Sequence, residues 1–269
     1  MILMRLVAMT LAGCARAVAA LAERLAHAHL FLSGILPAVL PPEQLARLMR
    51  RFYDHSYDQA GIAIPLEAFP WSLEPWEERV AADHLTAPGP ILVLGAGLGR
   101  ESLVLAERGY RVLGLDLARR GLTIGASRGQ SLAHPPAFVQ ADFLRLPIRP
   151  ASVGTVLIPS VMYSAVPGRA RRRAWIEALR TCLKPDGRMI LNFLIAREPE
   201  TTLTRSIRTG ARLLLHLPGS NSDYQPGDAC TNGHFMHVFQ TERELREELA
   251  GTRAQVVAIH WTDGFAVLS

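Results

Sequence analysis

From Pro90 to the end of the chain, short aliphatic runs alternate with longer amphipathic stretches. This alternation is typical of βαβ units, in which helices connect parallel strands across the faces of one sheet. The aliphatic runs predict strands at residues 91–94, 111–115, 137–140, 153–158, 188–193, 255–260 and 264–268. The amphipathic stretches predict helices at residues 99–108, 119–128, 169–183, 201–217 and 242–249. We therefore expect an α/β fold built on a seven-stranded, mostly parallel sheet.

The two ends of the chain depart from this pattern. Only Trp261-Thr262-Asp263 separates the last two predicted strands, and a parallel crossover needs about a dozen residues, so a C-terminal antiparallel hairpin is expected. Residues 1–87 are mostly helical in pattern, with breaks at Pro41-Pro42 and over 61–75, and predict an N-terminal helical extension or lid on a core of residues 88–269. A segment of about 196–236 has few strand signals and predicts a substrate lid inserted into that core.

The strongest local signal is a buried strand that runs into a glycine-rich turn and then a helix, Ile91-Leu-Val-Leu-Gly95-Ala-Gly97-Leu-Gly99-Arg100. Side chains at these glycines would block a nucleotide-like ligand from the backbone, and the helix N-terminus supplies N–H donors. The other interpretation is a turn that serves only tight packing of strand against helix. Dinucleotide folds use Gly-x-Gly-x-x-Gly, whereas Gly95, Gly97 and Gly99 alternate strictly.

Asp116 ends the second predicted strand, after the glycine turn. At this place a carboxylate accepts hydrogen bonds from ribose hydroxyl groups. NAD presents the same ribose, so Asp116 predicts a ribose and not one particular cofactor. An NAD(P)-dependent oxidoreductase is therefore an alternative, although the glycine spacing disfavours it.

With these features in place, the chain from about Pro90 to Ser269 resembles the class I, Rossmann-like S-adenosylmethionine-dependent methyltransferases. Three further motifs carry the resemblance, in order Gln140-Ala-Asp142-Phe143, Leu183-Lys-Pro-Asp-Gly-Arg188 and His237-Val-Phe-Gln-Thr241. The resemblance implies a Rossmann-like fold and S-adenosylmethionine as the cofactor. It also implies that Asp142 binds the adenine amino group and that Phe143 packs on the ring.

Other positions complete the expected cofactor site. Pro159, directly after the fourth predicted strand, is included in it. Tyr57 lies in a segment similar to an N-terminal helix of many small-molecule methyltransferases, where a tyrosine reaches the cofactor; its alternative role is to cover the core. The family usually has an acidic residue where this chain has Val93, so Glu101 or a backbone carbonyl is expected to hold the methionine amino group instead.

Substrates of open α/β sheets bind beyond the carboxyl ends of the strands. The loops that follow the fourth and fifth predicted strands contain Tyr163, His234 and His237. Either histidine is a candidate general base near neutral pH, or an ordinary histidine of the fold. Tyr163 is expected to orient a polar acceptor or to fill the cleft floor. The two histidines lack a third ligand with metal spacing, so no metal site is expected.

Charge and cysteine content exclude several other classes. The formal net charge is +5, and all the basic residues except Lys184 are arginines. The densest run, Arg169 to Arg173, has no interleaved aromatic residues, so it is interpreted as a solvated helix face and no nucleic-acid partner is expected. Cys14, Cys182 and Cys230 are too few and too scattered for a disulfide framework, which predicts a reducing, cytoplasmic location.

Residues 30–40 are apolar, but prolines interrupt them well short of the roughly 20 residues that a membrane-spanning helix needs. Peripheral contact of the N-terminal helices with a membrane stays open, and both a monomer and a homodimer are compatible with the sequence. The expected reaction is methyl transfer to the oxygen, nitrogen or sulfur of a small metabolite or natural product. A non-catalytic, methyltransferase-like partner protein is a further alternative, because Val93 departs from the family pattern.

Overall fold

The computed structural model describes residues 2–53, 69–85, 89–197, 200–231 and 234–269. Its main sheet has seven strands in the order β3-β2-β1-β4-β5-β10-β9. The strands are β1 (Ile91–Leu94), β2 (Val112–Asp116), β3 (Ala137–Gln140), β4 (Val153–Ile158), β5 (Leu183–Asn192), β9 (Val256–His260) and β10 (Phe265–Leu268). Neighbouring strands from β3 to β5 are parallel, and β10 is antiparallel to both β5 and β9. The predicted mostly parallel sheet and its C-terminal hairpin are confirmed.

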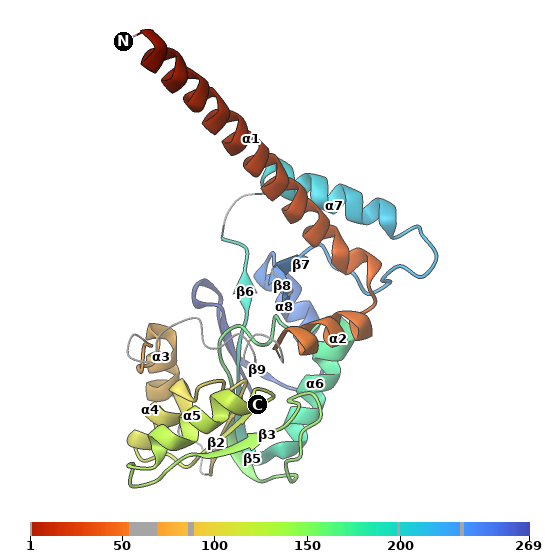
Figure 1. The fold of residues 1–269 in the computed structure, drawn as a ribbon. Coiled ribbons are helices and arrows are strands. Elements are labelled where there is room, and N and C mark those ends of the chain that lie inside the picture. The colour runs from red at the N-terminus through yellow and green to blue at the C-terminus, as the bar shows by residue number, and fades with distance from the viewer. Residues whose placement is uncertain (1, 54–68, 86–88, 198–199, 232–233) are drawn as a thin grey trace.

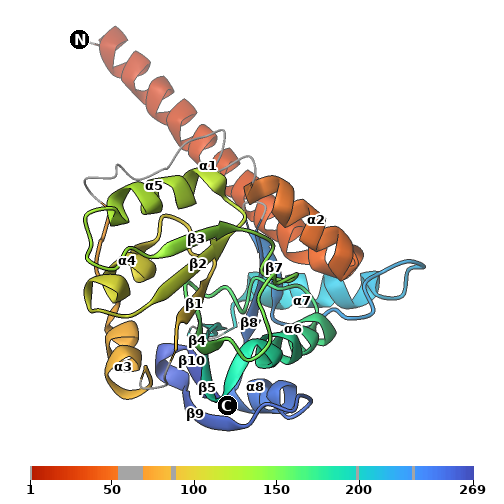
Figure 2. The same cartoon turned by 90° about the horizontal axis from the view of Figure 1, so that it is seen from below.

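Helices cover both faces of this sheet (Figure 2). On one side lie α3 (Pro75–Asp83), α4 (Arg100–Glu107) and α5 (Arg119–Gly129), and on the other lie α6 (Arg169–Cys182) and α8 (Glu242–Leu249). Successive side chains of β1 alternate between the two layers, since Leu92 and Leu94 pack with residues of α6 and α8 while Ile91 and Val93 pack with residues of α3 and α4. Burial on both faces explains why β1 is a continuous aliphatic run.

A second, smaller sheet follows β5, in the order β6-β8-β7. It consists of β6 (Leu194–Ile195), β7 (Asp228–Thr231) and β8 (His234–Phe239), with α7 (Thr202–Leu214) inserted between β6 and β7. Within the described part of residues 196–236, α7 matches the helix expected there, while β7 and the start of β8 are short strands that the sequence did not predict. In β8 the inward positions hold Phe235, His237 and Phe239, and the polar residue among them hides the period-two pattern in the sequence.

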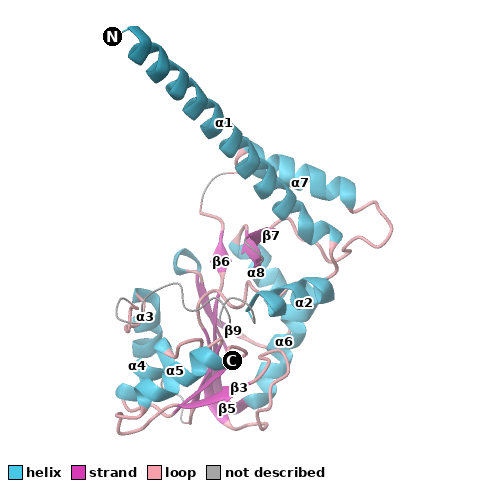
Figure 3. Cartoon of the chain, in the orientation of Figure 1, coloured by secondary structure: helices cyan, strands magenta, loops and turns pink. Residues whose placement is uncertain are grey.

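The N-terminal part of the chain forms two helices, α1 (Ile2–Val39) and α2 (Pro42–Tyr53). Pro42 begins α2, as expected for a proline in the first turn, but α1 continues past Pro37 to Val39 instead of breaking there. The C-terminal part of α1 packs on α7 and β7, while its N-terminal part projects from the body (Figures 1 and 3). Among the described helices, none is both long enough and apolar enough to cross a membrane. The division into an extension and a core at residue 87 stays a prediction.

Candidate active site

The glycine turn lies between β1 and α4, at the carboxyl edge of the main sheet. Gly95, Gly97 and Gly99 all have positive φ angles, of 75°, 51° and 85°. A Cβ atom at Gly97 would meet no described atom within 4 Å, whereas a Cβ at Gly95 would lie 2.9 Å from Met162 Cγ and one at Gly99 would lie 2.7 Å from Phe138 Cζ. Gly97 therefore borders the open space that a ligand can enter. Gly95 and Gly99 permit close packing, and the expectation that they also make room for the ligand stays a prediction.

Alanine substitutions should separate these two roles. Gly97→Ala places a methyl group in open space, so we expect weaker binding of the cofactor and a stability loss of only about 1 kcal/mol from the left-handed backbone. Gly99→Ala also forces Phe138 aside, so its free energy of unfolding should fall by roughly a further 1–3 kcal/mol. Urea denaturation and isothermal titration with the cofactor measure the two effects. Equal stability losses in both variants would contradict this assignment.

Asp116, the last residue of β2, ties the glycine turn to the neighbouring strand. Its Oδ2 accepts the Gly97 N–H at 2.8 Å and its Oδ1 accepts the Ala118 N–H at 2.8 Å. Burial raises the pKa of Asp116, and the backbone N–H donors oppose that rise. Each carboxylate oxygen has two acceptor sites, so one remains on each for a ribose hydroxyl. The carboxylate and the open space at Gly97 together fit the adenosine of S-adenosylmethionine.

A cavity of about 440 Å³ continues from this edge. Asp142 and Phe143 line it together with Leu117, which directly follows Asp116, and α2 forms another of its walls. Arg50 of α2 forms an ion pair with the Asp142 carboxylate, and the Phe143 ring lies 5.2 Å from the Trp175 ring. The two residues that the resemblance assigned to adenine thus border one cavity beside the ribose-binding position.

Val93, which stands where an acidic residue was expected from the resemblance, lies in apolar surroundings. Val93 is fully buried and packs in the apolar cluster beneath α3 and α4. Glu101 is also buried, and its Oε1 accepts a hydrogen bond from Arg100 Nη2 at 2.5 Å. Burial raises the pKa of Glu101 to about 7. The positive charge of Arg100 opposes this rise, but Arg100 also pairs with the buried carboxylate of Glu77. A role for Glu101 in holding the methionine amino group stays a prediction.

The turn after β4 is strained and lies next to the glycine turn. Pro159 is buried at its start, and Ser160 and Val161 follow with φ angles of 53° each, which is costly for a β-branched residue. The Val161 N–H donates to Asn192 Oδ1 at 2.6 Å, and Asn192 Nδ2 donates to the Gly264 carbonyl at 2.9 Å. Asn192 therefore holds this turn in place. Our sequence reasoning missed it, although a polar residue that ends a buried aliphatic strand is the signal.

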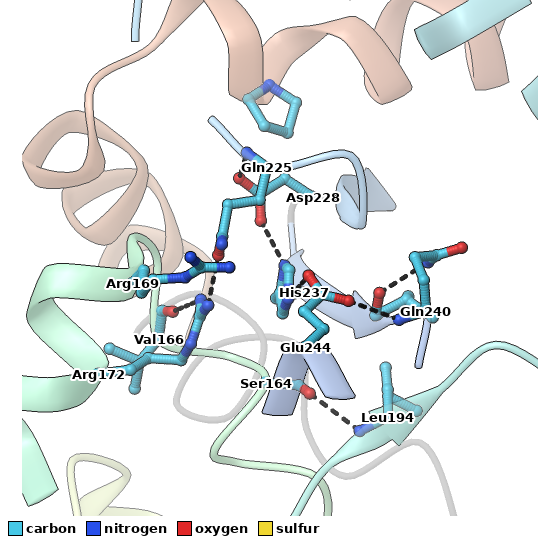
Figure 4. Close-up of polar contacts among 12 residues, drawn as sticks. Ser164, Val166, Arg169, Arg172, Leu194, Gln225, Asp228, His237, Gln240 and Glu244 are labelled. Carbon is cyan, nitrogen blue, oxygen red and sulfur yellow. Dashed lines mark hydrogen bonds and ion pairs between the residues drawn. The ribbon is translucent and has the colours of Figure 1, made fainter. Parts of the chain in front are cut away.

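A buried ionic network lies where α6, α8 and the small sheet meet, and Figure 4 shows two of its members, Arg172 and Gln225. Arg172 is fully buried and donates to both oxygens of Glu248, from Nε at 2.8 Å and from Nη2 at 2.6 Å. The Tyr163 hydroxyl donates to the same carboxylate at 2.5 Å, and Arg172 Nη2 also donates to Gln225 Oε1 at 2.6 Å. The interpretation of Arg169 to Arg173 as a solvated face is therefore wrong for Arg172.

His237 extends the polar contacts into the small sheet. It is fully buried, its Nδ1 lies 2.8 Å from Asp228 Oδ1 of β7, and its Nε2 lies 3.3 Å from Glu244 Oε1 of α8. Burial lowers the pKa of His237, but the two carboxylates outweigh burial and raise it overall. Because both ring nitrogens face carboxylates of the protein, the contacts favour a histidine that fastens the small sheet to α8.

The three candidate catalytic residues therefore have different surroundings. Tyr163 and His237 are fully buried with protein partners, so nothing in their contacts supports proton transfer with a substrate, and that role stays a prediction. His234, at the start of β8, is partly buried, and burial lowers its pKa, which favours the neutral imidazole that a base requires. Tyr57 lies outside the described residues.

Replacing His237 with glutamine is expected to remove a pH-dependent contribution to stability. Since the pKa of His237 in the folded chain is raised above its ordinary value of 6.5, its charge stabilises the fold fully below that pH, and the contribution disappears as the pH rises through the raised pKa. The excess unfolding free energy of the wild type over the variant, measured by urea denaturation, should therefore decrease with rising pH. The exposed His27, changed to glutamine, is the control. A difference that does not vary with pH would contradict the prediction.

Comparison with known proteins agrees with this geometry. Residues 92–191 match the family model described as a methyltransferase domain. The chain is similar in structure to an S-adenosylmethionine-dependent methyltransferase from Methanosarcina mazei, with 21% identity and a TM-score of 0.51 over 73% of this chain and 96% of that chain. It is also similar to 1,6-didemethyltoxoflavin-N1-methyltransferase from Burkholderia thailandensis, with 19% identity and a TM-score of 0.56 over 86% and 89% of the two chains.

A phosphoethanolamine N-methyltransferase from Haemonchus contortus aligns at 16% identity and a TM-score of 0.51, over 77% of this chain and 40% of that chain. Comparison with curated protein sequences returned no significant match. The strand order and the similar structures show a Rossmann-like fold, and the family match shows a methyltransferase domain at residues 92–191. This match favours S-adenosylmethionine-dependent methyl transfer over the oxidoreductase alternative. No comparison tests the non-catalytic alternative.

Proposed function

We propose that this methyltransferase acts on a small molecule, at an oxygen, nitrogen or sulfur atom. The observation that carries the proposal is that one cavity of about 440 Å³ extends from the residues assigned to adenine to the segment 165–167 that follows β4, where acceptors of open α/β sheets bind. Its walls include α2 and the segments 142–145 and 165–167 of the same chain. A cavity of this size built from one chain suits a metabolite better than a macromolecular acceptor.

Two of the structural relatives support this proposal. The Burkholderia enzyme was crystallised with 1,6-didemethyltoxoflavin and S-adenosylhomocysteine, and the Haemonchus enzyme with phosphoethanolamine and S-adenosylhomocysteine. Their ligands differ in chemistry while the fold is shared, because acceptor choice depends on the side chains around the cofactor and not on the sheet. The small sheet and α7, which follow β5, are accordingly proposed as the substrate lid.

S-adenosylmethionine, when bound, supplies an electrophilic methyl group on a sulfonium. The chain's part is to position the two reactants and to exclude water. Asp116 would hold the ribose and Phe143 would pack on the adenine, while α2 closes one side of the cavity. A base is needed only when the acceptor arrives protonated, and His234 is the residue we propose for that task. A cytoplasmic location is proposed on the scattered cysteines alone.

The proposal can be tested by offering the enzyme all potential acceptors of a cell extract. The extract is divided by ultrafiltration into a low-mass and a macromolecular fraction, and each fraction is incubated with the enzyme and S-adenosylmethionine that carries a radiolabelled methyl group. We expect label to appear in the low-mass fraction, where chromatography can then isolate the product. The Asp116→Ala variant, which is expected to bind the cofactor poorly, gives the background.

Label confined to the macromolecular fraction would contradict the small-molecule proposal but would leave the methyltransferase activity intact. Absence of label in both fractions, combined with measurable binding of S-adenosylmethionine by isothermal titration, would argue that the acceptor is missing from that extract. The experiment would then be repeated with extracts of other sources. Absence of binding would argue against the cofactor site itself.

A further inference from the structure

Helix α1 is attached to the body only near its C-terminal end, among the residues that the structure describes. There, Asn221 donates to the Pro37 carbonyl at 2.7 Å from its side chain and to the Ala38 carbonyl at 2.9 Å from its backbone. Gly34 allows α7 to approach, since a Cβ atom at Gly34 would lie 2.7 Å from Ile207 Cγ2. From Cys14 to Leu30, in contrast, every residue is exposed, and Figure 1 shows this part of α1 projecting as an arm.

The arm exposes apolar, aliphatic side chains to solvent, which is unfavourable in free energy. Val18, Leu21 and Leu25 are 67%, 57% and 62% exposed. Contiguous exposed apolar surface is uncommon on a monomer and marks a site of interaction. A long helix without tertiary packing also has little to stabilise it beyond its own hydrogen bonds. Both observations indicate that something covers one face of α1.

A heptad of apolar residues runs along α1, although Ile2, Leu3, Leu6, Met9 and several alanines lie outside it. The spacing of three and four residues is kept without interruption along the helix, through Met4, Val7, Leu11, Cys14, Val18, Leu21, Leu25, Ala28 and Leu32, which we call the α1 seam. Between Thr10 and His29, every leucine and valine lies on the seam. Arg16 and Glu23 lie seven residues apart on the opposite side. Apolar residues sustained in this way over about four heptads are the signature of a coiled coil.

The period of the seam distinguishes a helical partner from a lipid surface. A straight α-helix has 3.6 residues per turn, so a seven-residue repeat drifts by about 20° per heptad. Over the four heptads from Met4 to Leu32 the seam would therefore rotate by about 80° away from a flat surface such as a bilayer. A second helix that supercoils with α1 keeps the whole seam buried. The repeat thus favours a protein helix as the occupant.

We propose that a second copy of this chain packs along the α1 seam, so that two α1 helices form an intermolecular coiled coil. A symmetric pair places the same apolar residues on both sides, which makes the seam complementary to itself. The seam from Met4 to Leu32 is about 42 Å long and a helix is about 10 Å wide, which gives a smooth footprint of roughly 420 Å² on each copy. Interdigitated side chains bury more area than this smooth footprint. We therefore expect the total area buried on both copies to approach the lower end of the roughly 1,200–2,000 Å² of specific interfaces. The dimer is therefore expected to dissociate at micromolar concentration.

The test compares two double variants of the full-length chain by sedimentation equilibrium. Leu21→Glu/Leu25→Glu places charges on the seam, and Ala20→Glu/His27→Glu places the same number of charges on exposed positions away from it. We expect a monomer–dimer equilibrium for the wild type and the control, and a monomer for the seam variant. Cofactor binding should remain unchanged in both, because the arm lies outside the folded body, whereas the helical circular dichroism signal of the seam variant should fall, since its arm loses its packing partner.

Three outcomes would overturn the proposal. A wild-type chain that stays monomeric throughout the micromolar range is the first, and a seam variant that still dimerises is the second. The third is a control variant that is monomeric like the seam variant, since the effect would then not belong to the seam. Flotation with vesicles of phosphatidylcholine and phosphatidylserine identifies lipid as the occupant if a monomeric wild type binds them and the seam variant does not. The test is independent of the small-molecule proposal.

Discussion

Replacing Glu248 with alanine is expected to lower the free energy of unfolding by about 3–5 kcal/mol, because the substitution leaves a buried guanidinium without its counter-charge. Glu248 is fully buried and accepts two hydrogen bonds from Arg172 and one from the Tyr163 hydroxyl. Burial alone would lower the pKa of Arg172, but Glu248 outweighs burial and raises it. After the substitution, Arg172 would keep the Val166 carbonyl and Gln225 as acceptors, and both are uncharged.

Urea denaturation followed by circular dichroism measures this loss. The matched control lies on the same helix, because Glu242 of α8 forms an exposed ion pair with Arg246. Glu242→Ala should cost only about 0.3–0.5 kcal/mol, as solvent screens such a pair. A loss below about 1 kcal/mol for Glu248→Ala would mean that water reaches Arg172 in the folded chain. If Glu248→Ala does not fold, Glu248→Gln, which keeps an acceptor oxygen, should show a smaller loss.

Replacing Asp116 with alanine is expected to weaken the binding of S-adenosylmethionine by roughly 10- to 100-fold. The loss of a hydrogen bond to a charged group costs about 1.5–3 kcal/mol, and each 1.4 kcal/mol corresponds to about tenfold in affinity. The same carboxylate accepts the backbone N–H groups of Gly97 and Ala118, so the geometry of the glycine turn depends on it as well. Isothermal titration on the folded variant gives the affinity.

Asp186, which is exposed at the amino-terminal end of β5, provides the control substitution for this experiment. Asp186→Ala removes the same charge from the chain without touching the carboxyl edge of the sheet, and its affinity for the cofactor should equal that of the wild type. If Asp116→Ala bound the cofactor within about twofold of the wild type, the assignment of Asp116 to the ribose would be wrong, because the expected cost is several times larger.

Several features of the small sheet and the buried network were not predictable from local sequence. Arg172 and Glu248 are 76 positions apart in the chain, and each lies in a locally charged stretch that is typical of a solvated helix face. Their burial follows from how α6 and α8 pack against each other and the small sheet. His237 likewise has a carboxylate from β7 on one side and one from α8 on the other. Pairings of this kind depend on tertiary contacts, which the local periodicity of a sequence does not reveal.

What the sequence determined by itself is the strand-and-helix order of the main sheet, the C-terminal hairpin and the place of the glycine turn and Asp116 at the carboxyl edge. Those features depend on local physics, since aliphatic runs predict buried strands, a three-residue link requires a hairpin, and a glycine turn with Asp116 marks the carboxyl edge. Only the tertiary structure decided which glycine faces open space, that Asn192 holds the strained turn, and that Arg172 is buried. The reason is that burial and pairing belong to contacts between distant segments, and these exist only after the layers have packed.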